Sequence, residues 1–214
     1  MEKIDGGVTA AKGFLAAHTA AGIKYQGRDD MAMIYSKVPA VAAGTFTRNV
    51  VKAAPVKWDQ QVVGESPFVQ AVVMNAGIAN ACTGQEGMGY CKETADAAGS
   101  ALGIPSQAVL VASTGVIGMQ LPMDRLRAGI GAMVPKLEDT RQAAAAAAQA
   151  IMTTDTHKKE AAVTFTVDGK TVTVGGMSKG SGMIHPNMCT MLAFITTDLA
   201  ISHELLQEAL SSVV

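Results

Sequence analysis

The sequence predicts a mixed α/β fold. Short apolar or alternating runs that are typical of strands are interspersed with segments of helical spacing. Gly-rich loops separate these elements, and neither an internal repeat nor an interdomain linker stands out. Of the 214 residues, 49% are hydrophobic, so the chain can form one sizeable core or two small ones.

The first third of the chain predicts mainly extended structure. After a polar, small-residue segment that ends near Tyr25, an apolar run at 31–36 predicts a buried strand. The alternating run 42–47 predicts its partner, and the segment 52–56 is interpreted as a connector into another extended piece. The Val-rich run 68–74 predicts a further strand.

A loop dense in glycine, asparagine and small residues is expected at 75–89. Such a loop can bring backbone N–H groups close to a ligand, although a plain tight turn has the same composition. Helical spacing then runs from 92 to 102, and Gly103 with Pro105 beyond it predicts the end of this helix.

The middle of the chain predicts one strand and two helices. The apolar run 108–112 predicts a strand that ends directly before Ser113-Thr114-Gly115. Helical patterns cover 121–133 and 139–152, and the second contains an alanine run. Because Ala is the best helix former and allows close packing, this run is interpreted as scaffold.

The last part predicts a hairpin, a strand and a helix. Two alternating runs, 161–167 and 171–174, flank an Asp-Gly pair at 168–169, which is a strong hairpin signal. A strand is predicted at 192–196, followed by an amphipathic helix from its N-cap Ser202 to Leu210.

Charge and composition argue against several classes of protein. The formal net charge is −1 and no basic cluster stands out, so nucleic acid is not the expected partner. No run is long and apolar enough to span a bilayer, and the N-terminus does not have the pattern of a secretion signal, so no membrane partner is expected. Three cysteines without CxxC or CxxH spacing favour reduced thiols in the cytoplasm and no bound metal.

Thr190 is the candidate nucleophile. It stands where the Gly-rich loop 179–187, followed by Met188-Cys189, becomes an apolar strand. A hydroxyl is a poor nucleophile at neutral pH unless a base lies beside it, and an N-terminal Thr can use its own α-amino group. This requires scission of the Cys189-Thr190 bond, through attack of the Thr190 hydroxyl on the Cys189 carbonyl. The alternative is that Thr190 is an ordinary strand-entry residue.

Acyl transfer through such a hydroxyl also needs donors for the oxyanion of the tetrahedral intermediate. The Thr114 hydroxyl and the Gly115 backbone N–H, at the predicted strand end, are suited to converge on one oxygen. A simple turn after the strand is the alternative.

Four motifs make the chain resemble the ornithine acetyltransferase family, the bifunctional glutamate N-acetyltransferases/ornithine acetyltransferases of arginine biosynthesis. The motifs are GGVTAAKGF at 6–14, NAGIANACTG at 75–84, ASTGVIG at 112–118 and KGSGMIHPNMCTMLAFITTD at 179–198. They cover essentially the whole chain in the family's order. The resemblance implies a layered, Ntn-hydrolase-like α/β sandwich. Family members usually carry Ala before the nucleophilic Thr, where this chain has Cys189.

The resemblance implies specific roles at the site. Thr190 would be the nucleophile and also contact the substrate, with Thr114 and Gly115 as the oxyanion hole. An acetyl group would pass from N2-acetylornithine to Thr190 and then to glutamate. No cofactor is implied, although some family members accept acetyl-CoA as donor. Lys179 matches a substrate-binding Lys and Thr156 a substrate-contacting Thr; a solvated Lys and an ordinary loop Thr are the alternatives.

Three other polar residues receive structural interpretations. His185, near the nucleophile, is expected to be held by its loop, although a general base is conceivable. Cys82 and Cys91 are expected to be buried small hydrophobes.

Family chains are longer than this one and are cut before the nucleophilic Thr. Residues 1–189 therefore correspond to the family's α chain and 190–214 to the start of its β chain. The resemblance implies an α2β2 heterotetramer with a complementary C-terminal β chain. One alternative is a truncated or unprocessed, non-catalytic fragment or subunit that needs the missing C-terminal half. Another is a relative of aminopeptidases that use an N-terminal nucleophile.

Overall fold

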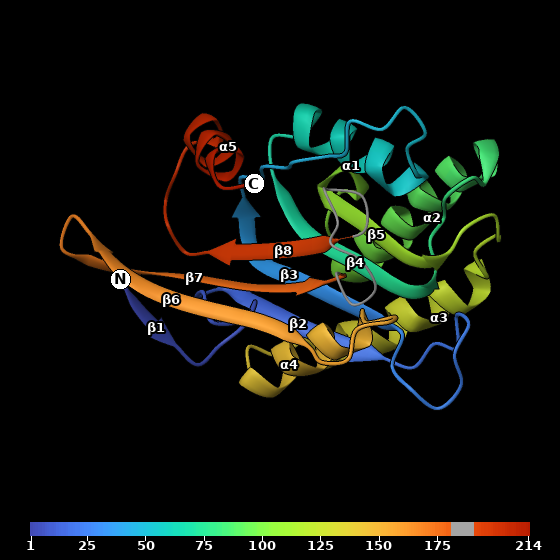
Figure 1. The fold of residues 1–214 in the computed structure, drawn as a ribbon, viewed down its shortest axis with the longest axis horizontal. Helices are drawn as coiled ribbons and strands as arrows, with labels where there is room; N and C mark the ends of the chain where they lie inside the picture. Colours follow the sequence, from blue (N-terminus) through green and yellow to red (C-terminus); the bar gives the residue numbers. More distant parts are fainter. Residues whose placement is uncertain (181–190) are drawn as a thin grey trace.

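Two four-stranded sheets form the frame of the computed structural model, which describes residues 1–180 and 191–214 (Figure 1). One sheet is antiparallel and has the order β1-β6-β7-β8, with β1 at Glu2–Ile4, β6 at Lys159–Val167, β7 at Lys170–Lys179 and β8 at Leu192–Thr197. The other has the order β2-β3-β4-β5, with β2 at Phe14–Thr19, β3 at Met31–Ala40, β4 at Val69–Ile78 and β5 at Val109–Val116. Its last pair, β4 and β5, is parallel.

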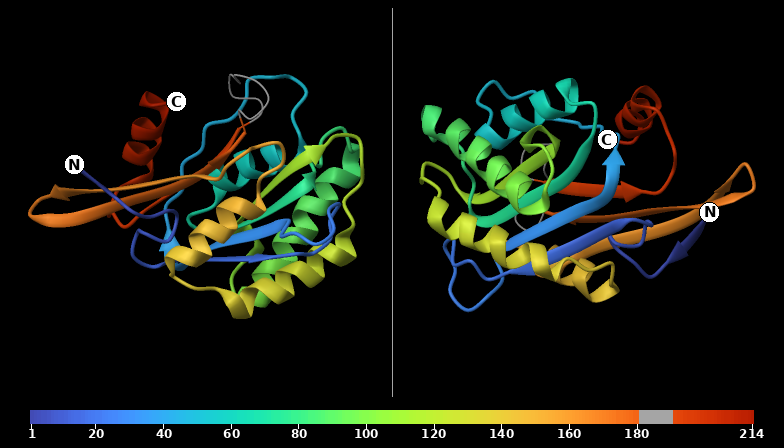
Figure 2. Two further views of the ribbon diagram at one scale, coloured as in Figure 1. Left: turned by 60° about the horizontal axis from the view of Figure 1, so that its bottom comes forward. Right: turned by 180° about the vertical axis from the view of Figure 1, so that it is seen from behind.

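Helices lie on both faces of the β2–β5 sheet (Figure 2). The α-helices are α1 (Ala54–Glu65), α2 (Gly84–Leu102), α3 (Met123–Met133), α4 (Arg141–Ala150) and α5 (His203–Ser212). Two short 3-10 turns, Ser106–Ala108 and Val134–Lys136, connect α2 to β5 and extend α3. The parallel pair β4–β5 is joined through α2, as a parallel connection requires.

The β2–β5 sheet is apolar on both faces, and strand alternation divides its side chains between two cores. On β3, Met31 and Met33 pack against α2 and α3, whereas Ala32 and Ile34 face α4 and the other sheet. Small alanines on the buried side of α4 allow that helix to lie close to the strands. The core that contains Ala32, Ile34 and the α4 alanines also contains Met177 of β7, so it joins the two sheets.

Most predicted elements are confirmed, with longer bounds. The strands expected at 31–36, 68–74, 108–112 and 192–196 are β3, β4, β5 and β8. The hairpin is β6–β7, and its turn residues Asp168 and Gly169 have φ of 49° and 75°, as a type I′ turn requires. The predicted helices are α2, α3, α4 and α5, with Gly103 at the left-handed C-cap of α2.

Three expectations were wrong, and two strands had not been expected. The segment 42–47 forms no strand, and β3 pairs with β2 and β4 instead. The segment around Pro55 starts α1, since proline in the first helical turn removes only an N–H that has no helical partner. The loop expected at 75–89 is short, because β4 continues to Ile78 and α2 begins at Gly84. The N-terminal segment contains β1 and β2, which the apolar pattern did not indicate.

The two described cysteines differ. Cys91 is buried, as predicted, and burial together with the charge of Asp59 raises the pKa of its thiol to about 12. Cys82 is exposed, which corrects the prediction; it lies with a φ of 57° in the short connection before α2. Among the described residues, no helix has the length and apolar character needed to cross a membrane.

Candidate active site

The ends of two strands from different sheets meet at the Lys179 ammonium group. Lys179 is the last residue of β7, and its Nζ donates hydrogen bonds of 2.9 Å to Thr114 Oγ1 on β5 and 2.9 Å to Thr153 Oγ1 in the segment after α4. Residues 65 positions apart in the sequence are thereby joined. Two sequence-predicted site residues, Lys179 and Thr114, are in direct contact.

The side chain of Thr114 reaches Lys179 because successive residues of β5 point to opposite faces. Ser113 points to the helix side, where its hydroxyl donates to Asn75 Oδ1 on β4 over 2.7 Å. Thr114 points to the other side, toward β7. The apolar run had predicted that the strand ends before Ser113. In the structure β5 continues to Val116, so Thr114 lies inside the strand.

Gly115 is the next residue of β5, and it pairs directly with Gly77 of β4. It has a φ of +135°, and a Cβ added there would lie only 2.2 Å from the carbonyl carbon of Gly77. A side chain at this position is therefore excluded by both conformation and space. Gly115 is exposed, so its backbone is accessible beside the Thr114 hydroxyl.

Lys179 is buried, with 3% of its surface exposed. Burial lowers the pKa of its ammonium group, the charge of Asp155 raises it, and Lys159 lowers it further, so the pKa lies below the ordinary value of 10.5. An ammonium group has three donors, and two of them are used by Thr114 and Thr153. No hydrogen bond from the third donor to any residue of 1–180 or 191–214 is present.

Asp155 and Lys159 form an ion pair next to Lys179. Asp155 Oδ1 also accepts the Gly180 N–H over 3.0 Å, and Lys159 Nζ donates to the Gly180 carbonyl over 3.0 Å. Burial tends to raise the pKa of Asp155, but hydrogen bonds from Lys159 and Gly180 and the charges of Lys159 and Lys179 outweigh it, and the pKa lies below the ordinary value.

Thr156 lies outside this cluster. Its side chain is exposed, and its hydroxyl is 3.1 Å from His157 Nδ1. Thr153, three residues earlier in the same threonine-rich segment, contacts Lys179 instead. Sequence reasoning did not single out Thr153, Asp155 or Lys159. The concentration of Thr and Asp directly after a predicted helix end was the available signal for the first two.

Thr190, Cys189 and His185 lie outside the described residues. Around the candidate nucleophile, the structure describes the chain up to Lys179 and Gly180 on one side and from the start of β8 at Leu192 on the other. Lys179 and Leu192 are register partners in the β7–β8 pair, so both ends of the intervening segment lie side by side.

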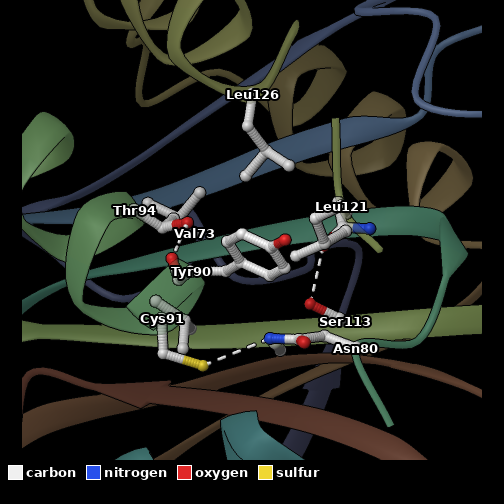
Figure 3. A pocket seen from close by; sticks show the side chains of 11 residues that line it. Val73, Asn80, Tyr90, Cys91, Thr94, Ser113, Leu121 and Leu126 are labelled. Carbon is white, nitrogen blue, oxygen red and sulfur yellow. Dashed lines mark hydrogen bonds between the residues drawn. The ribbon is translucent and has the colours of Figure 1, made fainter. Parts of the chain in front are cut away.

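A small cavity lies on the helix side of β5, with Ser113 in its lining (Figure 3). Its volume is about 10 Å³, roughly that of one water molecule. Tyr90, Leu121 and Leu126 close it, and the Asn80 amide, which donates to Cys91 Sγ, forms part of its wall. It is too small for a substrate and lies on the opposite face of the strand from Thr114.

A larger groove, of about 480 Å³, opens beside the segment after α4. Thr153 and Asp155 belong to its wall, together with Arg28, whose Nη2 donates to the Met152 carbonyl over 2.5 Å. Its size is that of a small-molecule site. Among the described residues, no group of three His, Cys, Asp or Glu side chains is placed to hold a metal ion.

Comparison with known proteins gives consistent relatives. The family model described as "ArgJ family" matches residues 15–214. The arginine biosynthesis bifunctional protein ArgJ of Symbiobacterium thermophilum is 53% identical over 212 residues, which are 98% of this chain and 52% of that protein. The chain thus spans about half the length of the curated relatives it matches.

Two solved structures are similar to this chain over most of their own length. The arginine biosynthesis bifunctional protein ArgJ of Bacillus halodurans has a TM-score of 0.82 and 45% identity, covering 87% of this chain and 97% of the solved one. The ornithine acetyltransferase of Mycobacterium tuberculosis, solved in complex with ornithine, has a TM-score of 0.80 and 44% identity, covering 86% and 97%.

A distant likeness concerns the fold alone. The L-aminopeptidase D-Ala-esterase/amidase of Ochrobactrum anthropi, described as a variant of the Ntn hydrolase fold, has a TM-score of 0.57 at 10% identity, covering 97% of this chain and 68% of that one. The predicted Ntn-hydrolase-like α/β sandwich is therefore confirmed. Because the family model covers nearly all of its residues and the ArgJ likeness extends to both sequence and fold, the chain belongs to the ArgJ family.

Proposed function

We propose that this chain is part of an enzyme of arginine biosynthesis that moves an acetyl group from N2-acetylornithine to glutamate through an acetyl ester on Thr190. Membership of the ArgJ family supports the reaction class, and a relative of known structure is named an ornithine acetyltransferase. Acetyl-CoA is a possible second donor, with no other cofactor. The proposed location is the cytoplasm, where amino-acid biosynthesis takes place.

The observation that carries the proposal is the hydrogen bond from Lys179 to Thr114. An ammonium group can only donate, so the Thr114 oxygen must accept, and its own proton is left to point elsewhere. The positive charge behind the hydroxyl makes that proton a better donor. Thr114 is thereby prepared to donate to an oxyanion, together with the exposed backbone of Gly115.

Lys179 is proposed to have a second role, in binding the substrate carboxylate through the N–H that bonds to none of the described residues. A buried ammonium attracts a carboxylate strongly because little water screens the charges. The M. tuberculosis relative was solved with ornithine, an amino acid with such a carboxylate. Thr156 is kept as a proposed substrate contact, and its exposed hydroxyl is free to reorient from His157.

The nucleophile becomes active in this proposal when the chain is cut between Cys189 and Thr190. The hydroxyl of Thr190 attacks the Cys189 carbonyl, the amide nitrogen leaves as the new α-amine, and water hydrolyses the ester to give the Cys189 carboxylate. The lengths of the two solved relatives support this cut. Each is matched over 97% of its own length by 86–87% of this chain, so each is about as long as residues 1–189. The curated S. thermophilum protein, in contrast, is about twice as long as this chain. A complementary β chain in an α2β2 assembly would complete the site.

In the transfer itself, the Thr190 α-amine takes the hydroxyl proton as the oxygen attacks the acetyl carbonyl. Thr114 and Gly115 stabilise the oxyanion, and collapse of the tetrahedral intermediate releases ornithine with the returned proton. Glutamate then attacks the acetyl ester in the same way and leaves as N-acetylglutamate. Two half-reactions through one ester predict ping-pong kinetics.

The test is acetyl exchange between N2-acetylornithine and glutamate, with the longest form of the protein that the gene encodes. The wild type should show ping-pong kinetics, and Thr190→Ala should abolish exchange. Thr114→Val should lower kcat by about 100-fold, since one oxyanion donor is lost. Thr166→Val, a matched change at an exposed position of β6, should leave kcat unchanged. Absence of exchange in the wild type, or full kcat in Thr114→Val, would contradict the proposal.

One observation favours a second candidate, a non-catalytic fragment or subunit. The chain covers only 52% of the S. thermophilum relative. If the second candidate holds, the 214-residue chain alone stays uncut and inactive, and exchange appears only when a complementary chain is added.

A further inference from the structure

The residue that follows Lys179 is held at both of its backbone polar groups. The Gly180 N–H donates to Asp155 Oδ1 over 3.0 Å, and the Gly180 carbonyl accepts from Lys159 Nζ over 3.0 Å. Gly180 has a φ of 110°, a backbone conformation that glycine adopts without strain and other residues rarely adopt. A contact that fixes Gly180 therefore fixes the direction in which the chain leaves Lys179.

Asp155 and Lys159 are well placed to hold Gly180, because they also hold each other. They form an ion pair, and the Asp155 side chain has no exposed surface. Lys159 is the first residue of β6 and is the register partner of Ser178 on β7, directly before Lys179. The pair thus ties the segment after α4 to the start of β6 and the end of β7.

Asp155 also provides the negative charge for the buried Lys179. Within the described parts of the chain, Lys179 has neutral hydroxyl partners, Thr114 and Thr153, and the charged groups that act on it are Asp155 and Lys159. Asp155 Oδ2 is buried and accepts no hydrogen bond from the described residues. The charge of Asp155 also acts on the neighbouring ammonium, since it raises the pKa of Lys179 and so stabilises the charged form.

We propose that Asp155 and Lys159 are positioning residues: by clamping the backbone of Gly180, they hold the Lys179 ammonium against Thr114 in the geometry that acetyl transfer needs. Neither residue touches the reacting atoms in this account. The inference rests on the proposed function for its kinetic readout, because the role of Lys179 in transfer is itself proposed.

The kinetic test compares four variants in the longest encoded form of the protein. Asp155→Asn keeps the shape and an acceptor for the Gly180 N–H but loses the charge, and Lys159→Met loses both the charge and the donor. Each should lower kcat/KM for N2-acetylornithine by about tenfold or more, because a small misplacement of a catalytic group is costly. Lys159→Arg should recover most of the loss.

The control is Asp139→Asn, which removes a carboxylate from an exposed ion pair with Lys37 over 3.0 Å. It should leave kcat/KM unchanged. Thermal unfolding of every variant identifies one that fails to fold. If Asp155→Asn does not fold, Lys159→Met and Lys159→Arg decide the outcome, since the Lys159 side chain is partly exposed. Wild-type kcat/KM in Lys159→Met would overturn the proposal.

A second readout needs no activity. In protein with ¹³C-labelled lysine, the Lys179 resonance is assigned by its absence from Lys179→Met and titrated with pH. Loss of the Asp155 charge should move the Lys179 midpoint to lower pH in Asp155→Asn and leave it in place in Asp139→Asn. Equal midpoints in the wild type and Asp155→Asn would overturn the proposal. If the wild type shows no acetyl exchange, the proposed function fails, and this titration still decides whether Asp155 acts on Lys179.

Discussion

The Lys179 ammonium donates hydrogen bonds to two hydroxyls, Thr114 and Thr153, and the negative charge that acts on it is that of Asp155. Burying a charge with neutral partners costs free energy, which is why its pKa lies below 10.5. The protein thus accepts a local loss of stability at this position, as is common at functional sites.

This cost predicts a pH-dependent effect of Lys179→Met on the free energy of unfolding. Because the pKa of Lys179 is lower in the folded than in the unfolded state, the unfolded state binds more protons between that lowered pKa and 10.5. Wild-type stability gains from this group as the pH rises through that window. The stability of Lys179→Met relative to the wild type should therefore be greatest at neutral pH and decline toward pH 10.5.

Urea unfolding at several pH values, with Lys37→Met as control, measures this effect. Lys37 is half exposed and pairs with Asp139 at the surface, so its variant should show no comparable decline. A stability difference for Lys179→Met that stays constant or rises with pH would contradict the burial argument.

Gly115 gives a second prediction for a single residue. In Gly115→Ala, the new Cβ would meet the Gly77 backbone and force alanine into a φ of +135°. The free energy of unfolding should fall by about 2 kcal/mol or more. The matched control, Gly131→Ala, adds a Cβ in open space on an exposed turn of α3 and should be neutral or slightly stabilising. Equal chemical-denaturation midpoints for the two variants would count against the close pairing of β4 and β5.

The sequence allowed some of these residues to be predicted and others not. Lys179, Thr114 and Gly115 stand in motifs from which they could be singled out as candidates, and the structure brings Lys179 and Thr114 into contact. Whether Thr153 or Thr156 contacts Lys179 depends on the path of the chain after α4. The hydrogen bond from Arg28 to the Met152 carbonyl helps to fix that path. That contact joins positions 124 apart and leaves no local pattern.

At the scale of elements, α4 and α5 have the same kind of N-cap but different surroundings. The Thr140 side chain accepts the Ala143 N–H at the start of α4, and the Ser202 side chain accepts the Leu205 N–H at the start of α5. One side of α4 is buried in the core that joins the two sheets, whereas α5 has no buried residue. The Gln207 side chain of α5 bonds both backbone groups of Gly44. Loss of the N-cap of α4 should therefore lower the free energy of unfolding of the whole protein. Loss of the N-cap of α5 should only make local opening of that helix easier.

Thr140→Ala should lower the global free energy of unfolding by about 1 kcal/mol. Ser202→Ala should speed amide hydrogen exchange in α5 and leave the global unfolding midpoint unchanged, because α5 can open by itself. Hydrogen exchange read by mass spectrometry, together with urea unfolding, separates the two effects. A global loss in Ser202→Ala equal to that in Thr140→Ala would show that α5 is coupled to the core.

Elements with a local signature were predicted well, and the misses have a physical cause. The Asp-Gly turn, the alanine-rich α4 and the Ser202 cap are each specified within a few residues. The segment 42–47 alternates like a strand, but its neighbourhood is occupied by α5 through the Gln207–Gly44 contact. Pro55 fits an extended connector and a first helical turn equally well, and only the packing of α1 on β5 favours the helix.

At the scale of the whole molecule, the site exists because two sheets pack on each other. β5 supplies Thr114, β7 supplies Lys179, and the segment after α4 supplies Thr153. No local pattern brings these three together, so the mixed α/β class could be predicted, whereas the meeting of the strand ends required the fold. Within one sheet, the pairing of β7 with β8 places Lys179 beside Leu192.

The most direct test of the proposed acetyl transfer is a mass-spectrometric trap of Thr190. The protein in its longest encoded form is incubated with N2-acetylornithine alone, quenched in acid and digested. We predict a peptide that begins at Thr190 and carries one acetyl group on the hydroxyl, which glutamate removes. A Thr190 that stays joined to Cys189, or that is cut but never acetylated by a substrate the enzyme consumes, would contradict the account.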